Sequence, residues 1–585
     1  MRHQTTKRLL PLLLSFCILL LSACGTKPQE DKKTTPDIPF GEFVDELYRT
    51  EVAADTLTLH YSLAHPENYG ITAGDITLGS YSQKDVTDSI PEIEASRETL
   101  LSYDYDSLTK VEQVLYDCIL FTMDSNLALS KYEYYSEPLG PTTGLQAQLP
   151  ILLAEYHFYS KEDIETYLEL LTQIKDYFED IAQYEREKSA AGTFMSDSVA
   201  EEIISQCQNY IQNPEENLLI ECFNNTVENF DGLTRDEIIL YEEQNREAVL
   251  GSVIPAYELL IDTLTQLKGT AVYEGGVSSL PDGAAYFEAL ARYETGSSMT
   301  MKEMQKRLKT AVQTALVSMS AAQFTDTTLY SRYERMKYPA TDPAEGLEYL
   351  KNAIKTDFPA LDDVDYSVKY VHKSLQEYLS PAMYLVPPFD DRNNNNIYIN
   401  QNPEYDLSSI FTTLAHEGYP GHLYQNVYYL STDPQPLQQL LRTSGYTEGW
   451  GTYAELYGYT LAGFDEALAE FCRNNMTAIL CLYGLTEIGV HYSGWDVDAT
   501  VSFWSDYGID AKTAKEIYGT ILAEPCSYLP YCVGYLEFMD LKALAQEALG
   551  DAFSPLDFHT FILTLGPAPF ATVKTALEEW ISEQK

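Results

Sequence analysis

Apolar residues recur at three- and four-residue steps through most of this chain, which is the spacing of one face of an α-helix. One such run follows Ser160 and another follows Thr300. The pairs Thr234…Glu237 and Thr300…Glu303 are typical of capping boxes, in which two side chains satisfy backbone N–H groups at a helix start. The two stripes are formed by Ile164, Leu168, Leu171, Ile174, Phe178 and Ile181, and by Met304, Leu308, Ala311, Ala315 and Met319. They predict core helices, in a chain that is mostly α-helical.

The pattern changes in the middle of the chain. Residues 366–371 alternate with a period near two, and residues 382–386 and 397–399 are rich in β-prone side chains. Pro387-Pro388 and the asparagines 393–396 separate the last two segments. We therefore predict a small antiparallel sheet, with the asparagine run as its hairpin loop. An edge strand of that sheet could hold an extended peptide by main-chain pairing.

The N-terminus has the features of a bacterial lipoprotein signal. Basic residues precede a nearly continuous apolar run over residues 9–21, which is too short to span a membrane comfortably. Leu21-Ser22-Ala23-Cys24 then reads as a lipobox. We expect residues 1–23 to be removed and Cys24 to be lipidated. The alternative is an ordinary secretory signal with a chance cysteine.

Composition fits a soluble domain tethered outside the cell. Residues 24–39 are rich in Lys, Thr, Pro and Asp and predict a flexible tether. Residues 40–585 then form the predicted helical domain, with two lobes around a cleft as one arrangement. The chain has 585 residues and a net charge of −50, so it repels nucleic acid and anionic membrane surfaces. Acidity mildly favours cationic or neutral substrates.

Two histidines and a carboxylate lie within seven residues, at His416, Glu417 and His422. Imidazole is the commonest protein ligand for zinc, and an adjacent glutamate can act on a water at the metal. Six residues rotate by about 600° in a regular helix, so the two histidines would point apart. Pro420-Gly421 predicts a kink that returns His422 to the side of His416. The alternative is unrelated polar residues at a broken helix end.

A second acidic segment supplies a third ligand for such a site. Glu448 and Glu455 are seven residues apart and share one face of a helix. Two histidines and one carboxylate leave a fourth position of zinc open for water. We rank Glu448 first as the ligand and Glu455 as an acceptor that orients a histidine, with Glu455 as the alternative ligand. The other interpretation is that these are solvated surface charges.

With these residues noted, the chain resembles the bacterial domain-of-unknown-function family eight-eight-five, whose members look like zinc peptidases and are often lipoproteins. The resemblance rests on His-Glu-x-x-Pro-Gly-His at 416–422 and Glu-Gly-Trp-x-x-Tyr-x-Glu at 448–455. Further matches are Val-His-x-x-Gly-Trp at 490–495, Tyr-Leu-x-Pro-Pro-x-Asp…Ile-Tyr-Ile-Asn at 384–400, and Leu-Pro-Asp-Gly-x-x-Tyr at 280–286. The family is distantly similar to helical gluzincin-type peptidases.

That resemblance implies a mostly helical zinc peptidase with a deep cleft, and it implies particular residues. Glu448 lies 26 residues beyond the second histidine, where those peptidases place a third ligand. Tyr531 falls on the position of a tyrosine near the transition state. Ser527 and Pro530 replace the family's glutamine and serine in that segment, so Tyr528 is a rival.

The sequence therefore predicts an extracytoplasmic, lipid-anchored zinc metallopeptidase that acts on short peptides. Glu417 is the expected general base, and Tyr531, with His491, is expected to donate to the developing oxyanion. One alternative is a metal-dependent amidase acting on a non-peptide amide. A second is a non-catalytic binding lipoprotein, although an intact Glu417 argues against a vestigial site.

Overall fold

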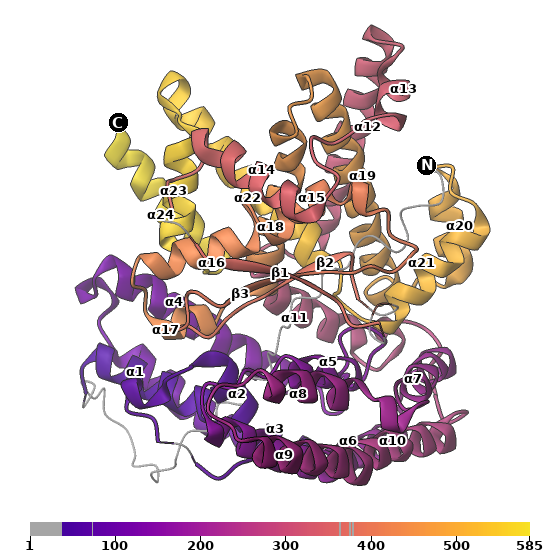
Figure 1. The fold of residues 1–585 in the computed structure, drawn as a ribbon. Helices are drawn as coiled ribbons and strands as arrows, with labels where there is room; N and C mark the ends of the chain where they lie inside the picture. Colours follow the sequence, from indigo (N-terminus) through magenta and orange to yellow (C-terminus); the bar gives the residue numbers. More distant parts are fainter. Residues whose placement is uncertain (1–37, 73, 362–363, 374–375, 377–378) are drawn as a thin grey trace.

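The computed structural model describes residues 38–585, apart from residues 73, 362–363, 374–375 and 377–378. The predicted signal segment and Cys24 lie outside the described residues. Most of the helices from α1 to α10 lie in the lower half of the molecule, coloured indigo to magenta in Figure 1. Their bounds are α1 (Phe40–Val52), α2 (Thr56–Ser62), α3 (Gln83–Ser102), α4 (Lys110–Leu129), α5 (Leu145–Ala154), α6 (Lys161–Ala191), α7 (Asp197–Tyr210), α8 (Leu218–Glu228), α9 (Arg235–Ala248) and α10 (Ile254–Leu267).

The remaining helices lie mainly above a small sheet that crosses the middle of the molecule (Figure 1). Their bounds are α11 (Gly283–Thr295), α12 (Met301–Thr325), α13 (Leu329–Glu334), α14 (Pro343–Ala353), α15 (Phe411–Glu417), α16 (His422–Ser431), α17 (Pro436–Leu440), α18 (Ser444–Leu461), α19 (Glu466–His491), α20 (Val497–Ser505), α21 (Ala511–Ala523), α22 (Leu529–Leu549), α23 (Pro555–Leu565) and α24 (Phe570–Gln584). The prediction of a mostly helical protein is confirmed.

Local signals located several helix starts correctly. Helices α9 and α12 begin directly after Thr234 and Thr300, and each threonine forms a capping box with the glutamate three residues on. Helix α6 begins directly after Ser160, which forms a capping box with Asp163. The predicted apolar stripes of α6 and α12 face the core, where most of their members are buried.

The sheet is mixed, so the prediction of an antiparallel sheet is wrong in one of its two pairings. Its strands are β1 (Tyr366–Tyr370), β2 (Ala382–Leu385) and β3 (Asn395–Ile399), in the order β1-β3-β2. Strand β2 pairs antiparallel with β3, but β1 runs parallel to it. Strand β3 is buried throughout and takes the centre, whereas β1 is largely exposed and forms an edge. Alternation reports which face of a strand is buried and cannot fix its partner. The asparagine run is divided, because β3 begins at Asn395.

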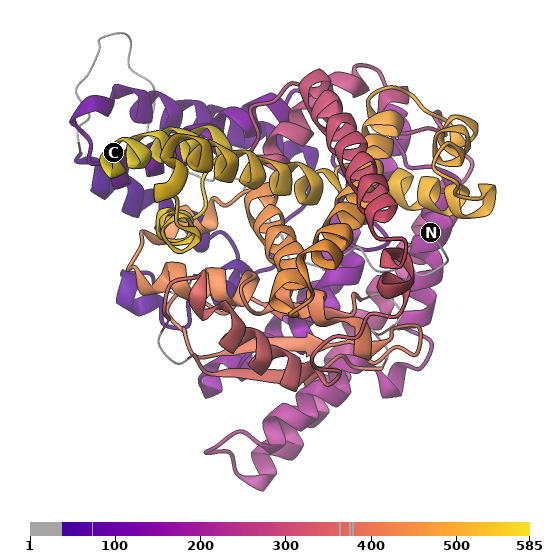
Figure 2. The ribbon, with the colours of Figure 1, turned by 90° about the horizontal axis from the view of Figure 1, so that it is seen from above.

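Two main hydrophobic cores hold the described residues together. One gathers α5 to α10, and the other joins α1, α3 and α4 to the sheet and to most helices from α11 to α24. Figure 2 shows the C-terminal helix α24 lying along the N-terminal helices. Lys110 Nζ on α4 lies 2.7 Å from Glu579 Oε1 on α24, which links the two ends of the chain. The N-terminal helices thus pack with the C-terminal half.

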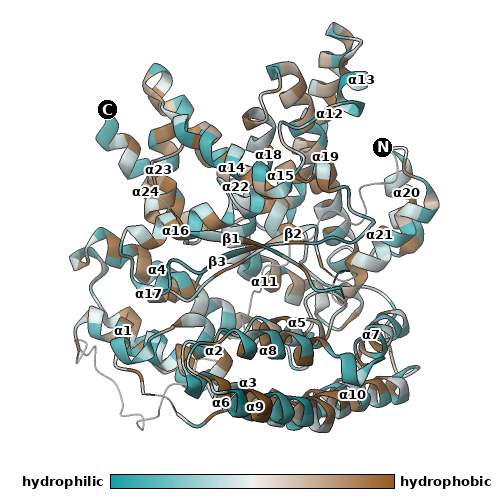
Figure 3. Cartoon of the chain, in the orientation of Figure 1, coloured by the Kyte–Doolittle hydropathy of each residue, from teal (hydrophilic) through white to brown (hydrophobic). Residues whose placement is uncertain are grey.

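Most helices carry both hydrophilic and hydrophobic residues along their length (Figure 3), as expected for helices with one buried face. Among the described residues, the continuous stretch Arg235–Leu267 is long and apolar enough to cross a membrane by composition. Half of its most apolar window is buried inside the protein, and Tyr257, Leu260 and Leu264 belong to a core. This stretch is therefore a core helix.

Candidate metal centre

The two histidines of the motif lie at a break between helices, as the sequence predicted. Helix α15 ends at Glu417 and α16 begins at His422. The rings of His416 and His422 have centroids 4.6 Å apart and are nearly perpendicular, at 80°. Gly421 permits this tight return, because a Cβ atom there would lie 1.7 Å from the carbonyl oxygen of His416. The break brings both imidazoles to one place.

Glu448 approaches the histidines from α18, which packs against α15. Its Oε2 lies 3.4 Å from His416 Nε2 and 3.8 Å from His422 Nε2. Potential ligand atoms of His416, Glu417 and His422 also lie within 4.8 Å of one another. These four side chains are 1–4% exposed. We call His416, Glu417, His422 and Glu448 the metal-site cluster.

The cluster has unpaired atoms of the kind that bind a metal ion. His416 Nε2, His422 Nε2, Glu417 Oε1 and Glu448 Oε2 are buried and have no hydrogen-bond partner among the described residues. Most buried polar atoms in proteins are hydrogen-bonded. Imidazole nitrogens and carboxylate oxygens are the ligands that zinc prefers. The donor set therefore fits a metal ion such as zinc.

Neighbouring groups hold two members of the cluster from behind. Glu455 Oε2 lies 3.3 Å from His416 Nδ1, which leaves Nε2 directed at His422 and Glu448. This contact has the geometry that an acceptor orienting a ligand histidine would need, and that role of Glu455 stays a prediction. The backbone N–H of Tyr384 on β2 donates to Glu417 Oε2 at 2.9 Å. The sheet edge and the cluster are therefore in direct contact.

Burial sets the electrostatics of the cluster. Burial disfavours the charge on His416, but Glu448 and Glu455 raise its pKa to about 10. Burial, and then His416, lowers the pKa of His422. Burial raises the pKa of Glu417 to about 8 and also raises the pKa of Glu448. Carboxylates this deeply buried require compensation, and a bound cation would supply it.

Tyr531 reaches the cluster and Tyr528 does not. The ring of Tyr531 lies 6.3 Å from that of His416, and Tyr531 lines a cavity together with Glu448. Tyr528 packs instead on Tyr483, with ring centroids 4.7 Å apart. Helices α18 and α22 meet at glycines, so that a Cβ atom at Gly449 would lie 2.4 Å from the backbone of Gly534. This close approach places Tyr531 beside Glu448.

His491 is a structural residue in this fold, contrary to the role that the sequence predicted. The N–H of Val277 donates to its Nδ1 at 3.1 Å, and its Nε2 donates to Ile521 O at 2.8 Å. Both ring nitrogens are thereby used, and the residue is fully buried. His491 has no N–H left to offer to an oxyanion, so we do not carry that role forward.

Glu487 holds the start of the helix that carries Tyr531, through contacts that the sequence did not reveal. Its carboxylate accepts from the N–H groups of Ser527 at 2.6 Å, Tyr528 at 3.2 Å and Leu529 at 2.8 Å. These N–H groups begin α22, the helix that carries Tyr531. The sequence feature that could have indicated these contacts is the position of Glu487 as a lone carboxylate within the apolar second half of α19. Glu487 thus anchors Tyr531 from a neighbouring helix.

Two cavities open beside Glu448, one member of the metal-site cluster. The larger has a volume of about 480 Å³ and the smaller about 170 Å³, and Ser444 and Glu448 line both. Residues of both hydrophobic cores contribute to their walls. A mostly helical protein with a buried His-Glu-His group, and with two cavities beside the neighbouring Glu448, belongs to the class of candidate metal-dependent enzymes.

The sequence matches a family model described as bacterial protein of unknown function (DUF885) over residues 67–577, so the chain belongs to this family. No curated protein matches the sequence. The resemblance drawn from the motifs is thereby confirmed.

Solved structures with the same fold come from other bacteria. A candidate lipoprotein from Colwellia psychrerythraea is 17% identical with a TM-score of 0.78, and the match covers 93% of this chain and 99% of that one. A candidate lipoprotein of unknown function from Shewanella oneidensis is 16% identical with a TM-score of 0.62, covering 92% and 98%. These identities establish a shared fold and nothing further.

Proposed function

We propose that the protein is a zinc-dependent peptidase that hydrolyses short peptides outside the cell. The observation that carries this proposal is the convergence of three buried, unpaired ligand atoms, His416 Nε2, His422 Nε2 and Glu448 Oε2, beside two cavities. These residues would hold the ion and leave a fourth position open. A bound zinc ion would polarise the scissile carbonyl and make a water molecule more acidic.

The chain's own residues supply the proton transfers. Glu417 is the proposed general base, since Tyr384 N–H fixes its Oε2 while its Oε1 is unpaired and faces the cluster. It would take a proton from the attacking water and pass it to the leaving amine. Tyr531, which lines the larger cavity beside Glu448, is the proposed hydrogen-bond donor to the oxyanion.

The form of the site favours short substrates. Members of the cluster are almost completely buried, and the cavities beside them hold tens of atoms and not a folded domain. A segment of peptide can enter such a space only in an extended form. Strand β2, whose backbone contacts Glu417, lies at a sheet edge where an extended peptide could pair.

We also propose that the protein is anchored to the outer face of the membrane through lipid on Cys24. The support is the lipobox Leu21-Ser22-Ala23-Cys24 and the description of two proteins of the same fold as candidate lipoproteins. An anchored enzyme would act on peptides that reach the cell surface.

The proposal is tested by combining metal analysis with a peptide-library digest of the detergent-solubilised protein. We expect about one zinc per chain, cleavage of short peptides, loss of cleavage with a chelator and recovery with added zinc. His416→Ala and His422→Ala should each lose the metal. Stoichiometric zinc in both variants would overturn the site. Intact peptides alongside hydrolysis of a non-peptide amide would instead favour the amidase.

A further inference from the structure

The two cavities that meet at Ser444 and Glu448 differ in chemical character. The smaller one is lined by apolar and hydroxyl-bearing side chains, by Gln439, and by the charged residues Arg442 and Glu448. The larger one has no Lys, Arg or His among the described residues that line it. Its polar lining includes uncharged hydroxyl and amide side chains, seven tyrosines and four carboxylates, which are Tyr81, Tyr132, Tyr135, Tyr184, Tyr286, Tyr293, Tyr531, Glu137, Glu294, Glu448 and Glu524. The smaller cavity thus contains a cation, Arg442, beside Glu448, whereas the charged residues described along the larger one are all carboxylates.

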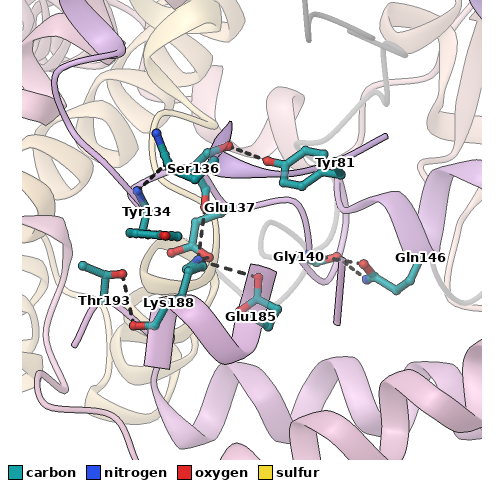
Figure 4. A network of polar contacts seen from close by, with 10 residues as sticks. Tyr81, Tyr134, Ser136, Glu137, Gly140, Gln146, Glu185, Lys188 and Thr193 are labelled. Atoms are coloured by element: carbon teal, nitrogen blue, oxygen red, sulfur yellow. Dashed lines mark hydrogen bonds and ion pairs between the residues drawn. The ribbon is translucent and has the colours of Figure 1, made fainter. Parts of the chain in front are cut away.

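One of these carboxylates is already neutralised from within the protein. Lys188 is fully buried, and its Nζ forms an ion pair with Glu137 and donates to Ser136 O at 3.1 Å. A second buried carboxylate, Glu185, lies 3.8 Å from the same Nζ. Figure 4 shows Lys188 between the two glutamates. The charge of Glu137 is therefore balanced by Lys188 and does not require a ligand.

No ion pair joins Glu294 or Glu524 to a cation within the part of the chain that the structure describes. Glu294 accepts from Ser444 Oγ at 2.5 Å. Glu524 Oε1 accepts from the N–H groups of Thr142 at 2.5 Å and Thr143 at 2.8 Å. Burial raises the pKa of both carboxyls, and the groups that oppose this rise are hydroxyls and backbone N–H groups. Glu524 is buried and Glu294 is partly buried. A carboxylate withdrawn from water is costly unless it is paired, so each would be stabilised by a positive ligand.

The side-chain amide of Gln148, which lines the same cavity, has an oxygen that receives no hydrogen bond from the described residues. Gln148 is 6% exposed, and its Nε2 donates to Thr142 O at 2.7 Å. Its Oε1 has no hydrogen-bond partner among the described residues. A buried, unpaired amide oxygen on the wall of a cavity is completed by an N–H donor. Gln148 and the glutamates therefore favour the same kind of ligand.

We propose that the larger cavity binds an amino or guanidinium group on the N-terminal side of the scissile bond, while Arg442 faces the carboxylate side of the peptide. This inference rests on the proposed peptidase function and gives it a substrate class. Ser444 precedes Glu448 by four residues on α18, which is about 6 Å along the helix. That distance corresponds to about two residues of an extended peptide. A positive group at Glu294 would thus belong to a residue close to the cleaved bond.

The test uses one short peptide prepared with its amino end free or acetylated and its carboxyl end free or amidated. We expect acetylation to lower kcat/KM of the wild-type holoenzyme by about tenfold to a hundredfold, the usual effect of losing a hydrogen bond to a charged group. Amidation should also lower it, through Arg442. An acetylated peptide with lysine before the cleaved bond then distinguishes a basic side chain from the α-amino group as the source of charge.

Glu294→Gln should abolish the acetylation effect and leave the amidation effect unchanged. The matched control is Glu537→Gln, because Glu537 also accepts from a serine hydroxyl, Ser297 Oγ, at 2.5 Å but lines neither cavity. This control should keep both effects. Cleavage that ignores the charge at the amino end, or an equal acetylation effect in Glu294→Gln, would overturn this inference alone. Failure to cleave any peptide would overturn the proposed function as well.

Discussion

A glycine on α18 lies directly against the ring of a predicted metal ligand on α15. A Cβ atom at Gly451 would lie 2.5 Å from His416 Nε2 and 2.7 Å from His422 Cε1. Real Cβ atoms do not approach other heavy atoms so closely. Gly451 also lies one helical turn beyond Glu448, so the same turn supplies both a carboxylate and the space that the imidazoles occupy.

Gly451→Ala should therefore displace the imidazoles and weaken metal binding. Changes beside a metal ligand typically reduce affinity by about 10- to 100-fold, and we expect a loss of this size in a competition titration with a zinc chelator. The control is Gly519→Ala in α21, where a Cβ atom would meet nothing within 4 Å. Equal zinc affinity in the two variants would show that the ring positions tolerate the methyl group.

A second prediction concerns the anchor of the helix that carries Tyr531. Glu487→Gln replaces an acceptor of three backbone N–H groups with an amide that offers one oxygen. Losing a helix cap alone costs about 0.5–2 kcal/mol. We expect lower stability and a lower kcat, with zinc content unchanged, because the cluster itself is intact.

The control for this change is another helix cap that lies away from the cavities. Asp510 accepts from Lys512 N and Thr513 N at the start of α21, and it is exposed. Asp510→Ala removes this cap and should destabilise the protein without changing kcat. If Glu487→Gln retains full turnover at normal zinc content, the anchor has no bearing on Tyr531.

The sequence was informative wherever a feature depends on neighbouring residues. The spacing of Glu448 and Glu455 predicted one helix face, and α18 presents both toward His416. The helix break between His416 and His422 followed from Pro420-Gly421, since these residues interrupt a helix by their own covalent geometry. The helix caps and the apolar stripes were predicted for the same reason, since each depends on residues close together in the sequence.

Features that depend on distant segments could not be predicted. His491 is hydrogen-bonded to Val277 and Ile521, and no pattern in the neighbouring sequence predicts either contact. The parallel pairing of β1 with β3 is likewise a contact between separate segments of the chain, and alternation within either strand does not specify its direction. Glu294 was one acidic residue among many in the chain, and only packing shows that it lines a cavity beside Glu448. Tertiary contact decides these cases.

The buried state of His491 predicts a specific loss of stability in acid. Burial lowers its pKa from 6.5 to about 4 in the folded protein, although the bond to Ile521 opposes this. The unfolded chain binds a proton below pH 6.5 while the folded chain does not. The stability that neutral His491 contributes is therefore fully present above pH 6.5 and is lost progressively as the pH falls toward 4.

This effect appears as a difference between wild type and His491→Gln. The variant lacks the titrating group, so its free energy of unfolding should fall less than that of the wild type between pH 7 and pH 5. The gap between the two proteins should narrow by about 2 kcal/mol over that interval. Denaturant unfolding at both pH values measures it, and titrations shared by the two proteins cancel. A constant gap would mean that folded His491 titrates normally.

The proposed anchor predicts a simple change in location. Cys24→Ser should prevent lipidation and move the protein from the membrane fraction to the soluble fraction. Cys17→Ser changes a cysteine inside the signal segment and should leave lipidation intact, which makes it the matched control. Fractionation, with mass spectrometry of the mature N-terminus, measures both. A Cys24→Ser protein that remains in the membrane fraction would require a different anchor.

The last prediction separates the base from the ligand within the cluster. Glu417 follows His416 directly and its side chain projects about 100° around the helix from it. One of its oxygens is held by Tyr384 N–H and the other is unpaired. Glu448 places its Oε2 within 3.8 Å of both Nε2 atoms. Glu417→Gln should therefore keep zinc and lose turnover, whereas Glu448→Gln should lose zinc.

The magnitudes make the comparison decisive. General base catalysis contributes about 10²–10⁴-fold, so peptide turnover by Glu417→Gln should fall by at least that order while its zinc content stays near one per chain. Glu448→Gln should regain part of its turnover in excess zinc, since the base is still present. Zinc content and turnover are measured for both variants at one pH. Zinc loss in Glu417→Gln with retention in Glu448→Gln would mean that Glu417 is the ligand and Glu448 the base. The geometry allows that outcome, because potential ligand atoms of His416, Glu417 and His422 lie within 4.8 Å of one another.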